Sequence, residues 1–428
     1  MKKLVAYLTI IISVFCASVT ANASTIPETI KIGLFFGSSA LSTAQIECDG
    51  DIVVYYDGQE VLRHGALTIQ ADENNLLQIT SGGEHLYTCD DKELKFAATA
   101  GLIQINGTPY RGSLQIINLK NGKMTVINKV GLEEYLYGVV PLEMSTGFPI
   151  EALKCQAICA RTYAVTSMGR FASQGFDLTN TTLSQVYGGA SVEQEDCTRV
   201  VDETRGKLVM YRGQPAQTFY SATSSGHTLN VKDVWGSELP YLVGVDDSLQ
   251  EKVKPGNDPW TVTYTKEELK QKLAANGVDI GDIVDMEIIE QSPEGAVTKL
   301  KFTGTNGEKI YERESTRTLL NLRSQCYTIE KPGSSSLMVL SSDQTVQCGS
   351  VTVLGAEGTT AQASGLSILS ADGVSDFQAQ PAGDTYILHG SGYGHGLGMS
   401  QNGAKAMALE GYSCEEILTH YFTGTEIQ

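Results

Sequence analysis

Two adjacent stretches carry most of the information in this chain: Gly131-Leu-Glu-Glu-Tyr-Leu-Tyr-Gly-Val-Val-Pro-Leu-Glu-Met144 and Phe148-Pro-Ile-Glu-Ala-Leu-Lys-Cys-Gln-Ala-Ile-Cys-Ala-Arg-Thr-Tyr-Ala164. They place one acidic residue, Glu143, at the end of an apolar run and shortly before a predicted helix. Apolar surroundings disfavour the charged form of a carboxyl group, so we expect the pKa of Glu143 to be raised towards that of a working acid. The local sequence alone allows a second interpretation, a helix-entry carboxylate beside a turn.

The second stretch predicts a long helix. Pro149 suits the first turn of a helix, and an apolar stripe continues to about Phe171. Gln156 and Tyr163 share one polar face of this helix, and Arg161 lies on another. These polar faces contact either a substrate or water, because a surface helix always has a solvated side.

Four further motifs follow in the chain. They are Gln185-Val-Tyr-Gly188, Ser224-Ser-Gly-His-Thr228, Asp233-Val-Trp235 and Gly392-Tyr-Gly-His-Gly-Leu-Gly-Met-Ser-Gln401. Together with the two stretches above, they cover roughly residues 108–245 and 386–425. In this order the motifs resemble the signature of the stage II sporulation protein D and amidase enhancer (SpoIID/LytB) family.

This resemblance implies a chemistry. In the sporulation members, the residue at the position of Glu143 is the catalytic acid of a lytic transglycosylase that cuts peptidoglycan glycan strands. In the enhancer members, the same domain stimulates a separate amidase. We therefore expect a lytic transglycosylase that acts in sporulation or cell-wall turnover. The alternative is a non-catalytic wall-binding enhancer, whose partner would be an N-acetylmuramoyl-L-alanine amidase.

The resemblance also suggests which side chains line the substrate groove. A hydroxyl-rich loop and a glycine-dense loop would bring hydrogen-bonding groups to the sugar. The expected substrate-binding residues are Arg161, Tyr163, Ser224, Ser225, His227, Thr228, His395 and Gln401. We expect the C-terminal loop to fold back beside Glu143, with His395 and Gln401 facing it.

Other classes of site fit the sequence poorly. Ser224-Ser-Gly-His is not the Gly-x-Ser-x-Gly elbow of a serine hydrolase. The glycine-dense loop 390–398 lacks both the G-x-G-x-x-G spacing and the lysine of nucleotide-binding loops. Some sporulation members carry a structural zinc, but the corresponding stretch here, Phe176 to Cys197, has one cysteine and no histidine. We expect no metal and no cofactor.

The patterning predicts an α+β fold built from several parts. Early segments alternate apolar and polar residues, with hairpin-type turns at Asp57-Gly58 and Asn121-Gly122. A later stretch is rich in Gly, Ser and Thr. The expected parts are an N-terminal β module (24–128), the first part of the catalytic domain (129–332), a β-rich insertion that bulges outward (333–385) and the C-terminal part of the catalytic domain (386–428).

Residues 1–23 have the form of a secretory signal peptide. Met1-Lys2-Lys3 is followed by an apolar run to about Val19 and by Ala21-Asn22-Ala23. An uncleaved anchor helix is the alternative, and the membrane would be a partner only in that case. We therefore expect the protein on the extracellular or cell-wall side of a bacterial membrane.

Charge limits the possible partners. The formal net charge is −18, and removal of Lys2 and Lys3 with the leader makes it −20. Phosphate backbones repel such a protein, which argues against nucleic acid and leaves a neutral sugar backbone open.

Eight cysteines follow residue 23, and an even number in an exported chain permits disulfides. Cys48 with Cys89 is the first pairing to test. Cys155 and Cys159 are expected to be small core residues on one face of the long helix.

Overall fold

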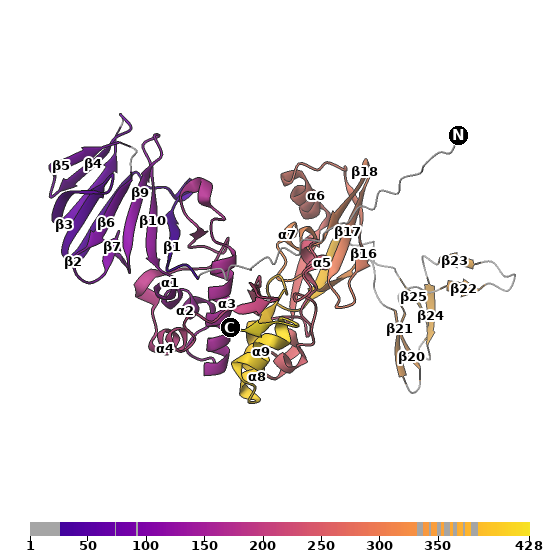
Figure 1. Cartoon of the computed structure of the whole chain (residues 1–428). Coiled ribbons are helices and arrows are strands. Elements are labelled where there is room, and N and C mark those ends of the chain that lie inside the picture. The colour runs from indigo at the N-terminus through magenta and orange to yellow at the C-terminus, as the bar shows by residue number, and fades with distance from the viewer. Residues whose placement is uncertain are drawn as a thin grey trace, which may run out of the picture.

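The computed structural model describes residues 26–72, 74–90, 93–331 and 384–428, and the backbone of six strands between 332 and 383. The expected secretory segment, residues 1–23, lies outside this described part. Within it, we find no helix with the length and apolar character needed to cross a bilayer. The architecture is α+β, as predicted: a β-rich N-terminal region leads into a region of helices and short strands (Figure 1).

The N-terminal region is a largely antiparallel sheet with the strand order β11-β1-β10-β9-β6-β2-β3-β4-β5. Its longest pair is β2 (Thr43–Tyr56) with β3 (Gln59–Ala71). The predicted turn between them is confirmed, because Asp57 and Gly58 have φ values of 51° and 78°, which suit a two-residue hairpin loop. The other strands of this sheet are β1 (Thr29–Phe35), β4 (Leu77–Ser81), β5 (Glu84–Cys89), β6 (Leu94–Ala98), β7 (Ile103–Ile105), β8 (Thr108–Tyr110), β9 (Ser113–Asn118), β10 (Met124–Gly131) and β11 (Leu178–Thr179).

The sheet and the helices of the signature region share one hydrophobic core. Strand β11 follows the long helix in sequence and pairs in parallel with β1, at Ile32 and Leu178. Ile46 of the sheet and Leu153 of the long helix are both 0% exposed in the same cluster of buried side chains. The N-terminal module therefore supports the signature region directly instead of folding around a core of its own.

The signature residues form three helices in succession: α1 (Leu132–Tyr137), α2 (Val140–Glu143) and α3 (Ile150–Thr166). Helix α3 begins after Pro149, as predicted, but it ends five residues before Phe171. The chain turns instead at Gly169, whose φ is 75°. Nearly all of α3 is buried, so it is a central core helix and has little solvated surface. The next helix, α4 (Glu195–Glu203), packs against it.

Residues 260–330 form a second unit with a separate core. Its sheets are β15-β26-β19 and β16-β17-β18, and its core includes Trp260, Leu300, Phe302 and Leu388. One strand of this unit, β26, comes from beyond residue 383. The expected insertion at 333–385 therefore interrupts the second unit in sequence, between β19 and β26. The elements between α4 and the insertion are β12 (Val209–Tyr211), β13 (Gln214–Pro215), β14 (Tyr220–Ser221), α5 (Val231–Trp235), β15 (Trp260–Thr265), α6 (Lys266–Ala275), β16 (Ile283–Gln291), β17 (Val297–Gly304), β18 (Gly307–Glu312), α7 (Ser315–Thr318) and β19 (Tyr327–Glu330).

The expected β-rich insertion contains three antiparallel hairpins, β20-β21, β22-β23 and β24-β25. In Figure 1 these hairpins lie apart from the sheets of the second unit. The strands are β20 (Leu337–Ser341), β21 (Gln344–Cys348), β22 (Thr352–Leu354), β23 (Thr360–Gln362), β24 (Leu366–Ser370) and β25 (Gly373–Phe377).

The C-terminal segment completes both units. Strand β26 (Thr385–Gly390) is the central strand of the β15-β26-β19 sheet. The chain then returns to the first core, where α8 (Gln401–Leu409) and α9 (Cys414–Tyr421) pack on α3 (Figure 1). Helix α9 begins with a capping box, in which the Ser413 and Glu416 side chains bind each other's backbone N–H groups. Two short strands accompany these helices: β27 (Met399–Ser400) pairs with β14, and β28 (Glu426–Ile427) pairs with β12.

Candidate active site

Glu143 is the last residue of the short helix α2 and is half-buried. Burial in its apolar surroundings raises the pKa of its carboxyl group above the ordinary value. Three neighbouring donor groups oppose this effect and favour the carboxylate: the backbone N–H of Val186, the side chain of Gln401 and the hydroxyl of Tyr220. Burial outweighs them, so the shift has the predicted direction.

The groups around Glu143 come from segments that are far apart in sequence. Val186 belongs to the 185–188 motif, Tyr220 to β14, and Gln401 is the first residue of α8. Parallel pairing of β14 with β27 sets Tyr220 opposite Met399, two residues before Gln401. The expectation that the C-terminal segment folds back towards Glu143 therefore holds for Gln401.

Sequence reasoning did not identify Tyr220 as a site residue. Tyr220 lies on the short strand β14, and the alternation of a strand does not say which of its sides faces a residue much earlier in the chain. Burial, followed by the charge of Glu143, raises the pKa of the Tyr220 phenol well above 10. At neutral pH the phenol is therefore protonated and can donate to the carboxylate.

The structure corrects the expectation for Arg161. Its guanidinium is fully buried, and its Nη2 lies 2.6 Å from the Glu133 carboxylate. The same group donates to the backbone carbonyls of Lys207 (3.2 Å) and Val201 (3.1 Å). All of these contacts lie inside the protein, so Arg161 holds elements together and is not available to a substrate.

The hydroxyl groups of two serines in the hydroxyl-rich loop also form hydrogen bonds with other groups of the protein. The Ser224 hydroxyl donates to a carboxylate oxygen of Asp247 at 2.6 Å, and both residues are almost fully buried. The Ser225 hydroxyl donates to the backbone carbonyl of Ser391 at 2.7 Å. These bonds tie the loop to its neighbours, which corrects the expectation that both hydroxyls face a sugar.

The remaining residues of this loop divide into one buried and one exposed side chain. The Thr228 hydroxyl, 1% exposed, accepts a hydrogen bond from the backbone N–H of Val245 at 2.9 Å. Thr228 is thus structural, against expectation. His227 is exposed, and its Nε2 lies 3.6 Å from Asp246 Oδ1.

His395 was expected to face the Glu143 carboxyl. Its contacts lie with other residues instead. Its ring packs against Trp235, with ring centres 5.4 Å apart. Its Nδ1 accepts the backbone N–H of Leu397 at 3.0 Å. Burial lowers the pKa of His395 to about 4, so the ring is neutral at pH 7. His395 is therefore a neutral packing residue whose Nδ1 holds the turn of its own loop at Leu397.

Tyr163 keeps a position beside an open cavity. This cavity of about 340 Å³ is lined by Tyr163, Arg170, Gln217 and Phe219, among others. The Tyr163 hydroxyl accepts a hydrogen bond from Arg170 at 3.2 Å, and its ring meets Phe219 edge-on at 6.0 Å. Tyr163 therefore remains a candidate for contact with a substrate.

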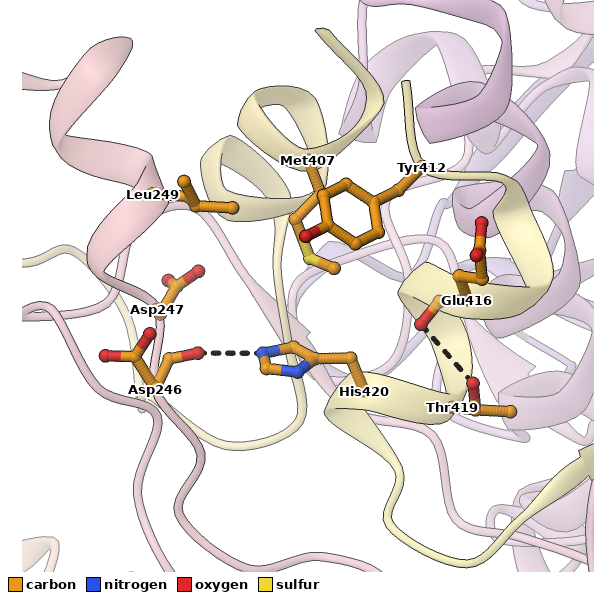
Figure 2. Close-up of a pocket in the computed structure, with 8 residues that line it drawn as sticks. All are labelled: Asp246, Asp247, Leu249, Met407, Tyr412, Glu416, Thr419 and His420. Atoms are coloured by element: carbon orange, nitrogen blue, oxygen red, sulfur yellow. Dashed lines mark hydrogen bonds between the residues drawn. The ribbon is translucent and has the colours of Figure 1, made fainter. Parts of the chain in front are cut away.

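A larger cavity of about 470 Å³ lies between α9 and the segment that contains Asp246 and Asp247 (Figure 2). Its lining does not include Glu143, Tyr220 or Gln401. Asp247 packs so closely on α8 that a Cβ at Gly403 would lie 1.9 Å from its Oδ1. This cavity therefore lies beside α8 and α9, and it is separate from the group of residues around Glu143. Its lining residues are Asp246, Asp247, Leu249, Met407, Tyr412, Glu416, Thr419 and His420.

Among the residues that the structure describes, no three His, Cys, Asp or Glu side chains come together in a way that could hold a metal ion. The pairing of Cys48 with Cys89 is wrong, because both are free thiols. Cys155 and Cys159 are 0% exposed and pack in the core, as predicted.

Comparison with known proteins identifies the family of this chain. A family model described as stage II sporulation protein matches residues 120–211, which contain Glu143 and helix α3. The chain is 30% identical over 317 residues to the stage II sporulation protein D of Bacillus subtilis, an alignment that covers 70% of this chain and 75% of that protein. The chain belongs to the stage II sporulation protein D and amidase enhancer family. It therefore has a role related to the cell wall.

Two further relatives differ in sequence identity to this chain and in the share of their length that it covers. An uncharacterised protein of Brachyspira hyodysenteriae is 31% identical over 76% of this chain and 73% of its own length. The amidase enhancer of Bacillus subtilis is 26% identical over 92% of this chain, which spans about half (53%) of that protein. A second family model, a domain of unknown function (DUF8618), matches residues 257–342 and so coincides with much of the second unit.

Proposed function

We propose that this family member is an exported lytic transglycosylase that cuts the glycan strands of peptidoglycan. The observation that carries the proposal is the state of Glu143: a half-buried carboxyl group with a raised pKa, surrounded by three hydrogen-bond donors. A raised pKa keeps a carboxylic acid partly protonated closer to neutral pH, as general acid catalysis requires.

The reaction would use this one carboxyl group twice. Glu143 first protonates the glycosidic oxygen between muramic acid and glucosamine, and the bond from C1 to that oxygen breaks. The resulting carboxylate then takes the proton of the muramyl C6 hydroxyl, whose oxygen bonds to C1 and closes an anhydro ring. Val186, Tyr220 and Gln401 would stabilise the carboxylate between the two steps, because each offers it a neighbouring hydrogen-bond donor.

The surroundings of Glu143 favour this scheme over ordinary hydrolysis. Most glycoside hydrolases use a pair of carboxyl groups on either side of the scissile bond. Among the described residues, the groups that shift the pKa of Glu143 are its apolar surroundings and three neutral donors, and no second carboxylate is among them. A mechanism with one recycled acid fits this arrangement.

The location and partners follow from the same proposal. The leader-like residues 1–23 would bring the protein to the wall side of the membrane, where its substrate lies. Its net negative charge is compatible with a neutral sugar backbone. A cell-wall amidase is the further partner that the enhancer relative suggests.

The test is product analysis with purified glycan strands and the purified chain. Wild type should release products with anhydro-muramyl ends, and Glu143→Gln, which keeps the shape but cannot supply the proton, should release none. Glu195→Gln is the matched control, because Glu195 is an exposed residue at the start of α4 and should cleave like wild type. Anhydro products from Glu143→Gln would show that another residue is the acid.

A non-catalytic enhancer is the second candidate. The alignment with the amidase enhancer covers 92% of this chain, against 70% for the sporulation protein, and so extends to parts that the latter does not match. The purified chain with and without an added amidase separates the two functions. If the chain alone yields no anhydro ends but stem-peptide removal by the amidase becomes faster, the enhancer function is correct.

A further inference from the structure

Two buried glutamines hydrogen-bond the two side chains that act as donor groups beside Glu143. Gln156 on α3 is 0% exposed, and its Oε1 lies 3.2 Å from Gln401 Nε2. Gln185 is 1% exposed, and its Nε2 lies 3.0 Å from the Tyr220 hydroxyl. Each side-chain donor to the acid therefore has a glutamine as its own partner.

Gln156 determines which end of the Gln401 amide points at the acid. A carboxylate can only accept hydrogen bonds, so Gln401 must offer it the NH₂ group. The Oε1 of Gln156 also accepts, and it binds the same NH₂ group. Turning the Gln401 carbonyl towards Glu143 would break the bond to Gln156, so Gln156 holds Gln401 in its donor orientation.

Gln185 has the corresponding effect on Tyr220. The phenol has one hydrogen and can donate it to only one acceptor. Gln185 presents an N–H to the phenol oxygen, which leaves the phenol hydrogen free for Glu143. The Gln185 amide is itself fixed, because its Oε1 accepts from Tyr135 at 3.2 Å and its Nε2 also donates to the Ala160 carbonyl at 3.3 Å.

Gln156 is not explained by packing alone. Its Nε2 is buried and has no hydrogen-bond partner among the described residues. A buried amide with an unpaired N–H is less favourable than an apolar side chain of the same size. Its side-chain bond to Gln401 is the contribution that an apolar residue could not make.

Among the described residues, no charged group is a main cause of the pKa shift of Glu143. The titratable groups that face Glu143 from neighbouring elements are the phenols of Tyr135 on α1 and Tyr220 on β14. Burial raises the pKa of both phenols well above 10, so both are neutral at the pH of interest.

We propose that Gln156 and Gln185 are positioning residues that fix Gln401 and Tyr220 as hydrogen-bond donors to Glu143. Both donors stabilise the carboxylate form of the acid, so the two glutamines favour the state that takes the proton in the second half of the reaction. The catalytic meaning of this inference rests on the proposed function, but the hydrogen-bond arrangement can be tested without any substrate.

The measurement is the pKa of Glu143 in the full chain, followed by carbon-13 NMR of labelled glutamate side chains and assigned by the signal lost in Glu143→Gln. Gln156→Met and Gln185→Met keep the side-chain length and remove the hydrogen bonds. Each should raise the pKa of Glu143, because a donor to the carboxylate is no longer held in place. If a methionine variant does not fold, Gln156→Asn or Gln185→Asn is used in its place. The shorter asparagine side chain cannot reach Gln401 or Tyr220.

A second comparison excludes a merely structural effect. Gln325→Met is the matched control: Gln325 is a buried glutamine that donates to the Val297 carbonyl at 2.9 Å in the second unit, and its loss should leave the pKa of Glu143 unchanged. In a Gln401→Ala background, Gln156→Met should add no further shift, because its effect passes through Gln401. Folded variants with an unchanged pKa of Glu143, or an undiminished shift in that background, would overturn the inference.

Activity measurements keep this inference apart from the proposed function. If the function is right, both methionine variants should lower kcat and leave KM nearly unchanged. If wild type gives no anhydro products but the pKa shifts occur, the proposed function fails and the positioning stands. If wild type cleaves glycan and neither the pKa nor kcat changes, the positioning fails alone.

Discussion

Arg161 and Glu133 form a buried ion pair, with 2.6 Å between Nη2 and Oε2 and side-chain exposures of 0% and 11%. The pair joins the middle of α3 to the first turn of α1, and the guanidinium also binds the carbonyls of Lys207 and Val201. A charge this deeply buried depends on all of its partners, so this motif arginine acts on stability.

Replacing Arg161 should therefore destabilise the protein. Arg161→Met leaves the Glu133 carboxylate buried without its partner, and we expect a loss of about 3–5 kcal/mol in the free energy of unfolding, measured with urea. Arg199→Ala is the control, because Arg199 pairs with Asp196 at the surface with 52% of its side chain exposed, and it should cost only ~0–1 kcal/mol. Equal losses in the two variants would show that the buried pair has no special weight.

The stability of Glu143→Gln should depend on pH in a defined direction. The folded-state pKa of Glu143 is raised, so its contribution to stability is complete below the ordinary value of 4.5 and is lost as the pH rises through the folded-state pKa. Glutamine undergoes no such loss. Urea unfolding at a series of pH values should show the variant gaining on wild type as the pH rises from 4 to 7. A difference in unfolding free energy between variant and wild type that stays constant over this range would mean that burial does not raise the pKa of Glu143.

Ser224 should affect stability and not substrate binding. Ser224→Ala removes a buried donor to Asp247 and should cost roughly 1–3 kcal/mol in unfolding free energy, since Asp247 then has one partner fewer. His227→Ala, in the same loop but exposed, should change stability by less than about 0.5 kcal/mol. Glycan affinity, measured on folded protein, should be the same for Ser224→Ala and wild type. Weaker glycan binding by this variant would return Ser224 to the groove.

The insertion should be dispensable. Strands β19 and β26 are antiparallel neighbours, with Glu330 opposite Ile387, so a short Gly-Ser turn can join them when residues 335–381 are removed. The shortened protein should keep the melting temperature and the glycan cleavage of wild type.

Truncation before Gly390 is the opposite case. It removes α8 and α9, including Gln401 and the fully buried Tyr421, and should abolish both cooperative unfolding and cleavage. Glycan cleavage by the chain truncated before Gly390 would contradict the role given to the C-terminal helices. Loss of cleavage in the chain without residues 335–381 would show that the insertion is required.

Features set by neighbouring residues were predictable from the sequence. The Asp57-Gly58 turn requires positive φ at adjacent positions, and the Ser413 cap requires a glutamate three residues on. The raised pKa of Glu143 was also accessible, because its apolar neighbours precede it directly in the chain.

Features set by distant partners were not predictable in this way. The spacing placed Arg161 on a polar helix face, but α3 is covered on nearly every side, and that face meets Glu133 instead of water. The hydroxyls of Ser224 and Thr228 suit sugar binding as chemical groups, but nothing local shows that Asp247 and Val245 already bind them.

The position of β26 has a consequence for the order in which the protein matures during synthesis. Glu143 is made well before the strand that completes the second unit and the helix that supplies Gln401. A nascent or prematurely ended chain thus contains the acid without its amide donor and without a closed second core. Only a chain that extends through α8 has the complete set of groups around Glu143, so any activity that depends on them must wait until α8 has been made and has folded back.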